Sequence, residues 1–140
     1  MKTVHGTAVA RGGRGVLILG ASGVGKSGLA LALMALGADL VADDAVQISA
    51  QGGEVTLSCP VAIRGMIEAR GVGLLTVNFV DKAKLAFVVN LDETAEERLP
   101  APRVAPYFGV DVPLISGKNT PALASVLWCL LGGGQLMPTE

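Results

Sequence analysis

One run of eight residues constrains the fold of this chain more than any other feature. It reads Gly20-Ala21-Ser22-Gly23-Val24-Gly25-Lys26-Ser27 and matches the pattern G-x-x-x-x-G-K-[ST] without interruption. Residues 15–19 before it form a short apolar stretch typical of a buried strand, and residues 29–36 after it are good helix formers closed by Gly37. The run is therefore predicted to be a loop between a strand and a helix, as in an α/β fold.

A glycine-rich loop in this position has a specific chemistry. Its backbone N–H groups point into one small volume, where they and the positive end of the helix dipole hold phosphate oxygens. The glycines let the backbone approach the ligand, Lys26 reaches the β- and γ-phosphates, and the Ser27 hydroxyl is placed to ligate Mg²⁺. A glycine-rich turn that only resembles this loop is the alternative, and both flanks argue against it. We therefore predict a P-loop that binds a nucleoside triphosphate, with ATP as the expected nucleotide.

Composition narrows the class of protein. The chain has 140 residues, of which 51% are hydrophobic and 16% charged, so one folded domain over residues 1–140 is expected. The net charge of −1 offers no general basic surface for nucleic acid. No apolar run reaches the ~20 residues that span a bilayer, and the N-terminus lacks the apolar segment of a secretory signal. We expect a cytoplasmic protein without membrane insertion, with Cys59 and Cys129 as reduced core thiols.

The pattern of apolar residues predicts strands between two helices. Strands are expected near 4–10, 16–19, 39–42, 46–49, 55–58, 74–79 and 84–91, and helices over 26–36 and 121–131. Thr120 is expected to cap the second helix. Residues 65–75 are predicted to be a loop or a single helical turn, and prolines between 100 and 113 predict irregular structure there. Because regular β-α alternation is missing, we expect a mixed sheet with flanking helices.

Two aspartates follow the predicted strand 39–42. The carboxyl end of a neighbouring strand lies beside a phosphate loop, where an acid can meet Mg²⁺ or accept a proton from a bound hydroxyl. Adjacent strand residues point to opposite faces, so only one of Asp43 and Asp44 is expected to face the γ-phosphate unless the strand has ended. An aspartate pair that caps a turn is the alternative. His5 is the only histidine, and a lone histidine is more often structural than catalytic.

Further charged residues allow two interpretations each. Glu68 and Arg70 lie among small and apolar residues, with Arg64 just upstream. They form either a buried ion pair or a metal-binding glutamate beside phosphate-binding arginines. Residues 92–98 are most simply a solvated face, and Lys118 lies in a short polar turn typical of a surface lysine.

Together these residues resemble the catalytic domain of HPr kinase/phosphorylase. The likeness rests on Val4-His5-Gly6, the phosphate loop, residues 40–44 (Leu-Val-Ala-Asp-Asp) and residues 64–73 (Arg-Gly-Met-Ile-Glu-Ala-Arg-Gly-Val-Gly). Their order and spacing fit along most of the chain and weaken after about residue 90. The segment 64–73 resembles that family's own signature, which makes the likeness more specific than the loop alone.

The resemblance implies a bifunctional enzyme. Members of the family use ATP and Mg²⁺ to phosphorylate a serine of HPr, the small phosphocarrier protein of the sugar phosphotransferase system. They also remove that phosphate by phosphorolysis with inorganic phosphate, which yields pyrophosphate. The family's catalytic domain resembles phosphoenolpyruvate carboxykinase in fold and assembles as hexamers, so a homo-oligomer is expected.

The resemblance also implies roles for single residues. Lys26 and the loop glycines would hold the triphosphate, while Ser27 and Glu68 match the Mg²⁺ positions. Asp44 matches the residue that accepts the serine proton in the kinase direction and returns one in the reverse reaction, with Asp43 a second candidate for the same role.

Two further matches concern catalytic side chains away from the loop. His5 matches a catalytic-site histidine, and a proton-relay or phosphate-contact role suits an imidazole side chain. Arg98 matches a further active-site arginine of the family.

The chain also departs from the family pattern. It begins almost at the catalytic strand, whereas the full-length family carries an N-terminal domain, and the segment between Glu68 and Arg98 is short for the family. Residues 113–119 resemble the family's loop associated with dephosphorylation. The second proline of that loop is Ser116 here and its arginine is Lys118. Lysine keeps the charge without the planar fork that grips phosphate, so the kinase direction is favoured over phosphorolysis.

Other functions remain compatible with the same loop. A small-molecule kinase would need a closed, polar acceptor pocket. A nucleotide-gated regulator needs no acceptor-side base, so the aspartate pair and Glu68 argue against it. A nucleotide-binding domain that has lost activity is the third alternative, supported only by the short length and Lys118.

Overall fold

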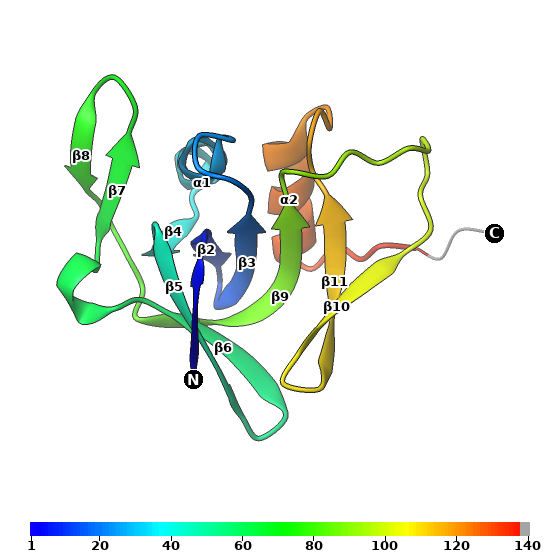
Figure 1. Ribbon diagram of the computed structural model, residues 1–140, viewed down its shortest axis with the longest axis horizontal. Helices are drawn as coiled ribbons and strands as arrows, with labels where there is room; N and C mark the ends of the chain where they lie inside the picture. The colour runs from blue at the N-terminus through cyan, green and yellow to red at the C-terminus, as the bar shows by residue number, and fades with distance from the viewer. Residues whose placement is uncertain (138–140) are drawn as a thin grey trace.

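The computed structural model describes residues 1–137, and a curled mixed sheet of nine strands dominates it (Figure 1). The strands are β1 (Lys2–His5), β2 (Thr7–Arg11), β3 (Arg14–Leu19), β4 (Asp39–Ala42), β5 (Ala45–Gln51), β6 (Glu54–Ser58), β9 (Lys82–Asn90), β10 (Arg103–Tyr107) and β11 (Val110–Ser116). Their order is β1-β5-β6-β9-β3-β2-β4, with β11 and then β10 joined to β9. Since β9 runs parallel to β3 and β11 while the other pairs are antiparallel, the predicted mixed sheet is confirmed.

Two helices cover one face of this sheet, α1 (Lys26–Leu36) and α2 (Leu123–Leu131), and they contact each other. The bounds predicted for α1 are confirmed. Alternate strand residues divide between two cores because successive side chains point to opposite faces. In β3, Val16 and Ile18 pack with the helices, whereas Leu17 packs in the hollow of the curled sheet. The helices therefore lie over the strand that leads into the phosphate loop.

The first predicted strand is divided at Gly6. β1 pairs with β5, whereas β2 pairs with β3 and β4, so the prediction of one continuous strand over 4–10 is wrong. A Cβ atom at Gly6 would lie 2.9 Å from the carbonyl oxygen of Ile18, a separation that no other residue type tolerates. This tight corner carries β1 to the far edge of the sheet and places His5 opposite Ala45.

Residues 65–73 form structure that the sequence did not predict, whereas the strand predicted from residue 74 is confirmed as far as Thr76. β7 (Met66–Ala69) and β8 (Gly73–Thr76) make a separate two-stranded hairpin that projects beside α1 (Figure 1), so the predicted loop or helical turn is wrong. β8 also ends at Thr76, short of the predicted strand end at residue 79. The strands are too short to show a clear period, and Gly71 and Gly73 adopt the positive φ angles of the turn, 82° and 142°.

The proline-rich segment is also more regular than expected. β10 and β11 form a hairpin despite Pro106 and Pro113, so the predicted irregular structure is wrong here. β10 pairs only with β11, and an edge strand tolerates proline because one row of its N–H groups has no ladder partner. In β11, pairing with β9 begins at Leu114, one residue after Pro113.

The second helix begins two residues later than predicted. Ala122, at its N-terminus, has a left-handed φ of 54°, and the Thr120 hydroxyl donates to the Ser116 carbonyl (3.1 Å) rather than capping the helix. At the other end, the Arg11 guanidinium donates to the Trp128 carbonyl (2.8 Å) and Arg14 donates to the Leu131 carbonyl (3.2 Å). Two cations at the negative end of the helix dipole stabilise α2 on β2 and β3.

The two cysteines differ. Cys59 is buried, as predicted, and burial raises the pKa of its thiol, whereas Cys129 is exposed on α2 and the prediction of a core thiol is wrong there. Across residues 1–137, no helix is both long and apolar enough to cross a membrane.

Candidate active site

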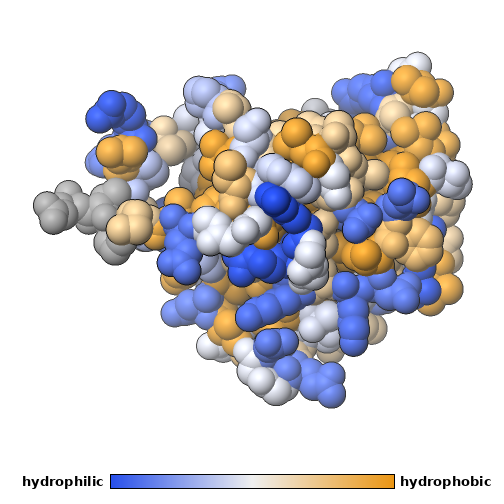
Figure 2. Space-filling model, turned by 180° about the vertical axis from the view of Figure 1, so that it is seen from behind, coloured by the Kyte–Doolittle hydropathy of each residue, from blue (hydrophilic) through white to orange (hydrophobic). Residues whose placement is uncertain are grey.

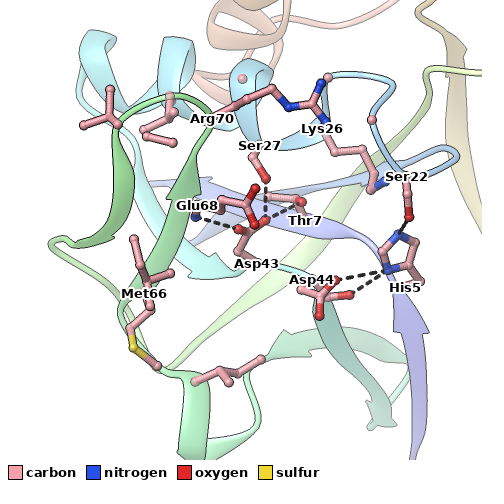
Figure 3. Close-up of a pocket in the computed structure, with 18 residues that line it drawn as sticks. His5, Thr7, Ser22, Lys26, Ser27, Asp43, Asp44, Met66, Glu68 and Arg70 are labelled. Atoms are coloured by element: carbon pink, nitrogen blue, oxygen red, sulfur yellow. Dashed lines mark hydrogen bonds and ion pairs between the residues drawn. The ribbon is translucent and has the colours of Figure 1, made fainter.

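The functional candidates gather where several strands end at one edge of the sheet. The phosphate loop follows β3, and Asp43 and Asp44 follow β4, which runs in the same direction as β3. Thr7 begins the antiparallel strand between them. A cavity of about 860 Å³ opens at this edge, bounded by the loop, the aspartates and the β7–β8 hairpin (Figure 3). Carboxyl ends of parallel strands are a common place for a ligand site in open α/β sheets.

The phosphate loop has the backbone conformation that its glycines predict. Gly20, Gly23 and Gly25 have φ angles of 152°, 84° and 108°, and Gly25 is the residue at which α1 begins. Lys26 is buried and folds across the loop, where its ammonium donates to the carbonyls of Gly20 (2.8 Å) and Ala21 (3.0 Å). The loop is thus held closed by its own lysine, with α1 directly behind it.

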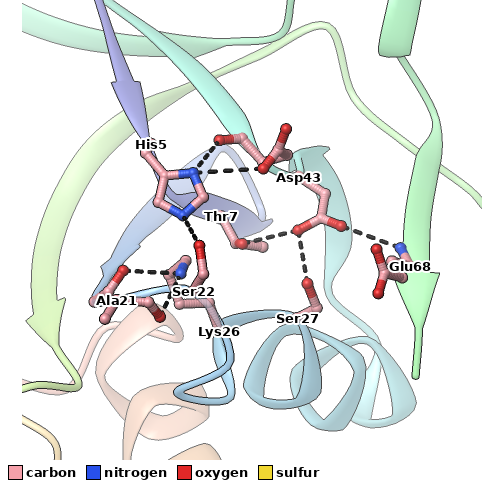
Figure 4. A network of polar contacts seen from close by, with 10 residues as sticks. His5, Thr7, Ala21, Ser22, Lys26, Ser27, Asp43 and Glu68 are labelled. Atoms are coloured by element: carbon pink, nitrogen blue, oxygen red, sulfur yellow. Dashed lines mark hydrogen bonds and ion pairs between the residues drawn. The ribbon is translucent and has the colours of Figure 1, made fainter. Parts of the chain in front are cut away.

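Asp43 is the acid that contacts the loop. Its carboxylate is 9% exposed and accepts three hydrogen bonds (Figure 4). The donors are the hydroxyls of Thr7 and Ser27, each at 2.9 Å, and the backbone N–H of Glu68 at 3.1 Å. Asp43 therefore joins the strand edge, the start of α1 and the β7–β8 hairpin.

Asp44 occupies a different environment. It has a left-handed φ of 73° and a side chain that is 82% exposed, at the mouth of the cavity. His5 Nδ1 lies 3.4 Å from the Asp44 carboxylate and 3.1 Å from its carbonyl oxygen. The other ring nitrogen, Nε2, lies 3.4 Å from the Ser22 hydroxyl (Figure 4). A chain of polar groups thus runs from Asp44 through His5 to the loop.

The two aspartates have different partners, and that only one of them faces the γ-phosphate stays a prediction. The strand ends at Ala42, and the left-handed turn at Asp44 directs the two carboxylates to different partners. Asp43, rather than Asp44, touches Ser27, and Asp44 faces His5 and solvent.

The residues near Ser27 suit a magnesium ion in their chemistry. The Ser27 hydroxyl, the Asp43 carboxylate and Glu68 line the same cavity, and oxygen donors of this kind are what Mg²⁺ prefers. Among residues 1–137 no group of three or more acidic, histidine or cysteine side chains forms a self-sufficient metal site. Mg²⁺ is commonly held by one or two carboxylates together with phosphate oxygens of a substrate.

The two arginines of the 64–73 segment separate. Arg70 reaches from the hairpin to the loop, since a Cβ built on Gly23 would lie 3.5 Å from the Arg70 guanidinium. Arg64 instead pairs with Asp81 at 3.4 Å and does not line the cavity. Within the described part of the chain no ion pair joins Glu68 to Arg70, so that interpretation is wrong.

Arg98 and Lys118 also lie outside the cavity. Arg98 is exposed in the long connection between β9 and β10, which leads away from the loop (Figure 1). Lys118 lies in the turn after β11, and its backbone N–H donates to the Glu93 carbonyl at 2.8 Å. The structure brings together His5, Ser22, Lys26, Ser27, Asp43, Asp44, Glu68 and Arg70, and leaves out Arg64, Arg98 and Lys118.

Sequence reasoning missed two residues of the site. Thr7 lay inside a predicted strand, yet its fully buried hydroxyl holds Asp43. Asp92 lay in a segment expected to be solvated, yet its carboxylate accepts from the Ala21 N–H at 3.0 and 3.1 Å. The second could have been found, because Asp92 follows a predicted strand in the way that Asp43 does.

Comparisons with known proteins agree with this geometry. The sequence model described as "HPr Serine kinase C-terminal domain" matches residues 1–105. An HPr kinase/phosphorylase of Nitrosomonas europaea is 34% identical over 86% of this chain and 44% of its own length. Its counterpart in Bordetella pertussis is 43% identical over 70% of this chain and 36% of its own. The solved structure of the Hpr(Ser) kinase/phosphatase from Coxiella burnetii superposes with a TM-score of 0.81 and 26% identity, covering 94% of this chain and 89% of that one.

The fold and the loop define a mixed α/β protein with a glycine-rich loop at the carboxyl edge of its sheet. More specifically, the chain belongs to the HPr serine kinase C-terminal domain family, as its sequence resemblance predicted. It spans less than half the length of the curated relatives named above.

Proposed function

We propose that this chain is a protein-serine kinase that transfers the γ-phosphoryl group of ATP to a seryl hydroxyl of an HPr-type phosphocarrier. Family membership supports this proposal, and one observation carries it at the level of chemistry. The loop, Ser27, the buried Asp43 and Glu68 bound the same cavity that has the exposed pair Asp44 and His5 at its mouth. A phosphate-holding side and an acceptor side thus face one space.

The acceptor side fits a protein substrate. The Asp44 side chain is exposed and, among residues 1–137, its carboxylate pairs with His5, so a serine on another protein can approach it. Asp43 is buried and already accepts three hydrogen bonds, so its carboxylate is less accessible to an incoming hydroxyl. In the proposed reaction, the serine oxygen attacks the γ-phosphorus, the bond to the ADP oxygen breaks, and the serine proton passes to Asp44.

The phosphate side holds the triphosphate with the loop N–H groups, Lys26 and Arg70. Lys26 exchanges its contacts with loop carbonyls for phosphate oxygens, and Arg70 lies close enough to the loop to contact the same anion. Mg²⁺ bound by Ser27 and Glu68 would neutralise charge that develops on the phosphates. Asp43 orients both of these groups through the Ser27 hydroxyl and the Glu68 N–H.

The remaining properties inherited from the family belong to the same proposal. They are removal of the phosphate by inorganic phosphate with release of pyrophosphate, assembly as a hexamer, and a cytoplasmic location. Arg98 and Lys118 lie outside the cavity, so their part in either direction depends on movement of their segments or on a neighbouring subunit.

Incubation with γ-labelled ATP, Mg²⁺ and an HPr-type carrier tests the proposal. Label on the carrier, and none on a carrier with its acceptor serine changed to alanine, is the expected result. ATP turnover without labelled carrier would instead favour a small-molecule kinase. Nucleotide binding without turnover would favour a non-catalytic regulator. The Asp44→Asn variant serves as the matched control, because asparagine keeps the shape and the left-handed backbone but accepts no proton.

A further inference from the structure

The acid that touches the start of the phosphate loop has no role in the reaction described above. Asp92 lies two residues beyond β9, and both of its carboxylate oxygens accept from the Ala21 N–H, at 3.1 and 3.0 Å. A negative charge beside a loop that binds anions is unfavourable for the ligand by itself. Its position therefore calls for a role other than contact with phosphate.

The contact fixes one particular peptide group. The carbonyl of Gly20 and the N–H of Ala21 belong to the same peptide plane. The Lys26 ammonium donates to that carbonyl at 2.8 Å, and Asp92 accepts from that N–H. A cation at the carbonyl end and an anion at the N–H end hold the peptide dipole in one orientation.

Asp92 is itself held in place by the strand that it follows. The Leu91 N–H donates to the Leu19 carbonyl at 2.8 Å, which continues the parallel pairing of β9 with β3 beyond the strand ends. The Asp92 N–H donates to the Asn90 side chain at 2.9 Å. The carboxylate is thus carried by an ordered turn anchored on the strand that leads into the loop.

The loop needs such support at this position. Gly20 has a φ of 152° that other residues rarely adopt, and the carbonyls of Gly20 and Ala21 both accept from Lys26. When Lys26 turns to a phosphate, the carbonyl end of the peptide is released, and the Asp92 contact remains. A loop that stays ordered while its lysine changes partners loses less conformational freedom on binding.

We propose that Asp92 is a positioning residue of the phosphate loop, whose carboxylate holds the Gly20–Ala21 peptide in its binding orientation and so raises the affinity for a nucleoside triphosphate. This inference rests on the nucleotide-binding part of the proposed function. It does not depend on the identity of the acceptor.

Two substitutions separate positioning from charge. Asp92→Asn keeps an acceptor oxygen for the Ala21 N–H and removes the charge, whereas Asp92→Ala removes both. ATP affinity measured by calorimetry is expected to fall about three- to tenfold in Asp92→Ala, the range for one lost hydrogen bond, and to stay within about twofold in Asp92→Asn. Glu96→Ala removes an exposed carboxylate from the same segment and is expected to bind as the wild type does.

Amide hydrogen exchange gives a second readout that needs no activity. The Ala21 amide is expected to exchange several times faster in Asp92→Ala than in the wild type or Asp92→Asn. The amides of Gly117 and Lys118 donate to the carbonyls of Asn90 and Glu93 and serve as internal controls, with unchanged exchange if the local fold is intact.

Several results would overturn the inference. They are unchanged ATP affinity or unchanged Ala21 exchange in Asp92→Ala, equal weakening in both variants, and tighter binding in both, which would mean that the charge only repels the ligand. If the wild type binds no ATP, the proposed function fails as well. If the wild type binds ATP and Asp92→Ala binds it equally, only the role of Asp92 fails.

Discussion

Two regions at the same edge of the sheet differ in whether their candidate residues lie at the cavity. Around the cavity, two hydrogen-bonded groups lie close together: Asp43 with Thr7, Ser27 and the Glu68 N–H, and Asp44 with His5 and Ser22 (Figures 3 and 4). Around the connections that follow β9 and β11, Arg98 and Lys118 lie outside the cavity, and the ion pair of Arg103 with Glu93 at 2.7 Å is exposed.

The residues near the loop already lie at the cavity, whereas Arg98 and Lys118 lie outside it. The buried side chains of Thr7, Lys26 and Asp43 beside the loop have hydrogen-bond partners within this chain, so nucleotide binding is expected to need only this chain. The candidates on the second region need a partner protein, another subunit or a change of loop conformation to reach the same phosphates.

The surface near the site carries both apolar and charged side chains. At the tip of the β7–β8 hairpin, Val72 is 81% exposed and lines the cavity beside Arg70. From behind, hydrophilic residues interrupt the apolar ones over much of the visible face (Figure 2). The hairpin tip therefore combines an apolar and a cationic group where an acceptor protein would approach.

The largest expected effect is at the loop lysine. Lys26→Ala removes the ammonium that the proposed reaction places on the phosphates, and ATP binding measured by calorimetry is expected to be abolished. Lys82→Ala, which removes an exposed lysine from β9, is the matched control. ATP affinity in Lys26→Ala equal to that of the control would contradict the assignment of the loop.

Substitution of Asp44 is expected to slow phosphoryl transfer without weakening ATP binding. Asp44→Ala is expected to lower the rate of carrier phosphorylation at least ~100-fold, the usual contribution of a general base, with ATP affinity close to that of the wild type. Asp44→Asn, which suits the left-handed backbone, should give the same loss without strain. Turnover near the wild-type level in single-turnover assays would remove Asp44 from this role.

The buried hydrogen bond from the Thr7 hydroxyl to the Asp43 carboxylate is expected to stabilise the fold. Thr7→Val keeps the shape but leaves Asp43 with one donor fewer, so we expect the free energy of unfolding in urea to fall by about 1–2 kcal/mol. Thr7→Ser keeps the hydroxyl and should retain most of the stability. Equal stability of the valine variant and the wild type would show that Ser27 and the Glu68 N–H alone satisfy the carboxylate.

In the second region, substitution of Lys118 is expected to leave ATP binding unchanged. Lys118→Ala is expected to bind ATP within about twofold of the wild type, because the side chain lies outside the cavity. Lys118→Arg is expected to raise the rate of phosphorolysis, measured as pyrophosphate release, since a guanidinium grips phosphate with two donors. A large loss of ATP affinity in Lys118→Ala would contradict the conclusion that the second region takes no part in nucleotide binding.

The smallest expected effect concerns the exposed ion pair of Arg103 and Glu93, whose contribution to stability should depend on pH. The hydrogen bond from Arg103 holds the pKa of Glu93 below its usual value of 4.5. A lowered pKa in the folded state stabilises the protein above the unfolded value, and this contribution is lost as the pH falls through the lower value. The stability difference between the wild type and Arg103→Gln should therefore be present at about pH 6 and shrink in acid. A difference that does not change with pH would exclude this ionisation as its source.

Much of the site was visible in the sequence because its signals are local. The loop pattern and its flanks predicted β3, the loop and the bounds of α1, and the strand before Asp43 and Asp44 predicted an acid beside the loop. Each of these predictions depends on residues close together along the chain.

The missed features depend on distant residues. The hairpin of residues 66–76 and the β10–β11 hairpin have short strands or prolines, and they exist because of pairing that local propensity does not reveal. The break at Gly6 follows from its approach to Ile18, and Ala21, the partner of Asp92, follows the neighbouring strand β3 and lies 71 residues away in sequence.

The sequence by itself determined a glycine-rich loop between a strand and a helix, a strand that ends in two acids, and membership of the HPr serine kinase C-terminal domain family. These are determined by sequence because glycine conformation and strand ends are properties of short segments. Only the tertiary structure decided that Asp43 supports Ser27 while Asp44 faces His5 and solvent. The reason is geometric. The left-handed turn at Asp44 and the corner at Gly6 set where each carboxylate points, and they take effect only when β1, β4 and the loop are packed together.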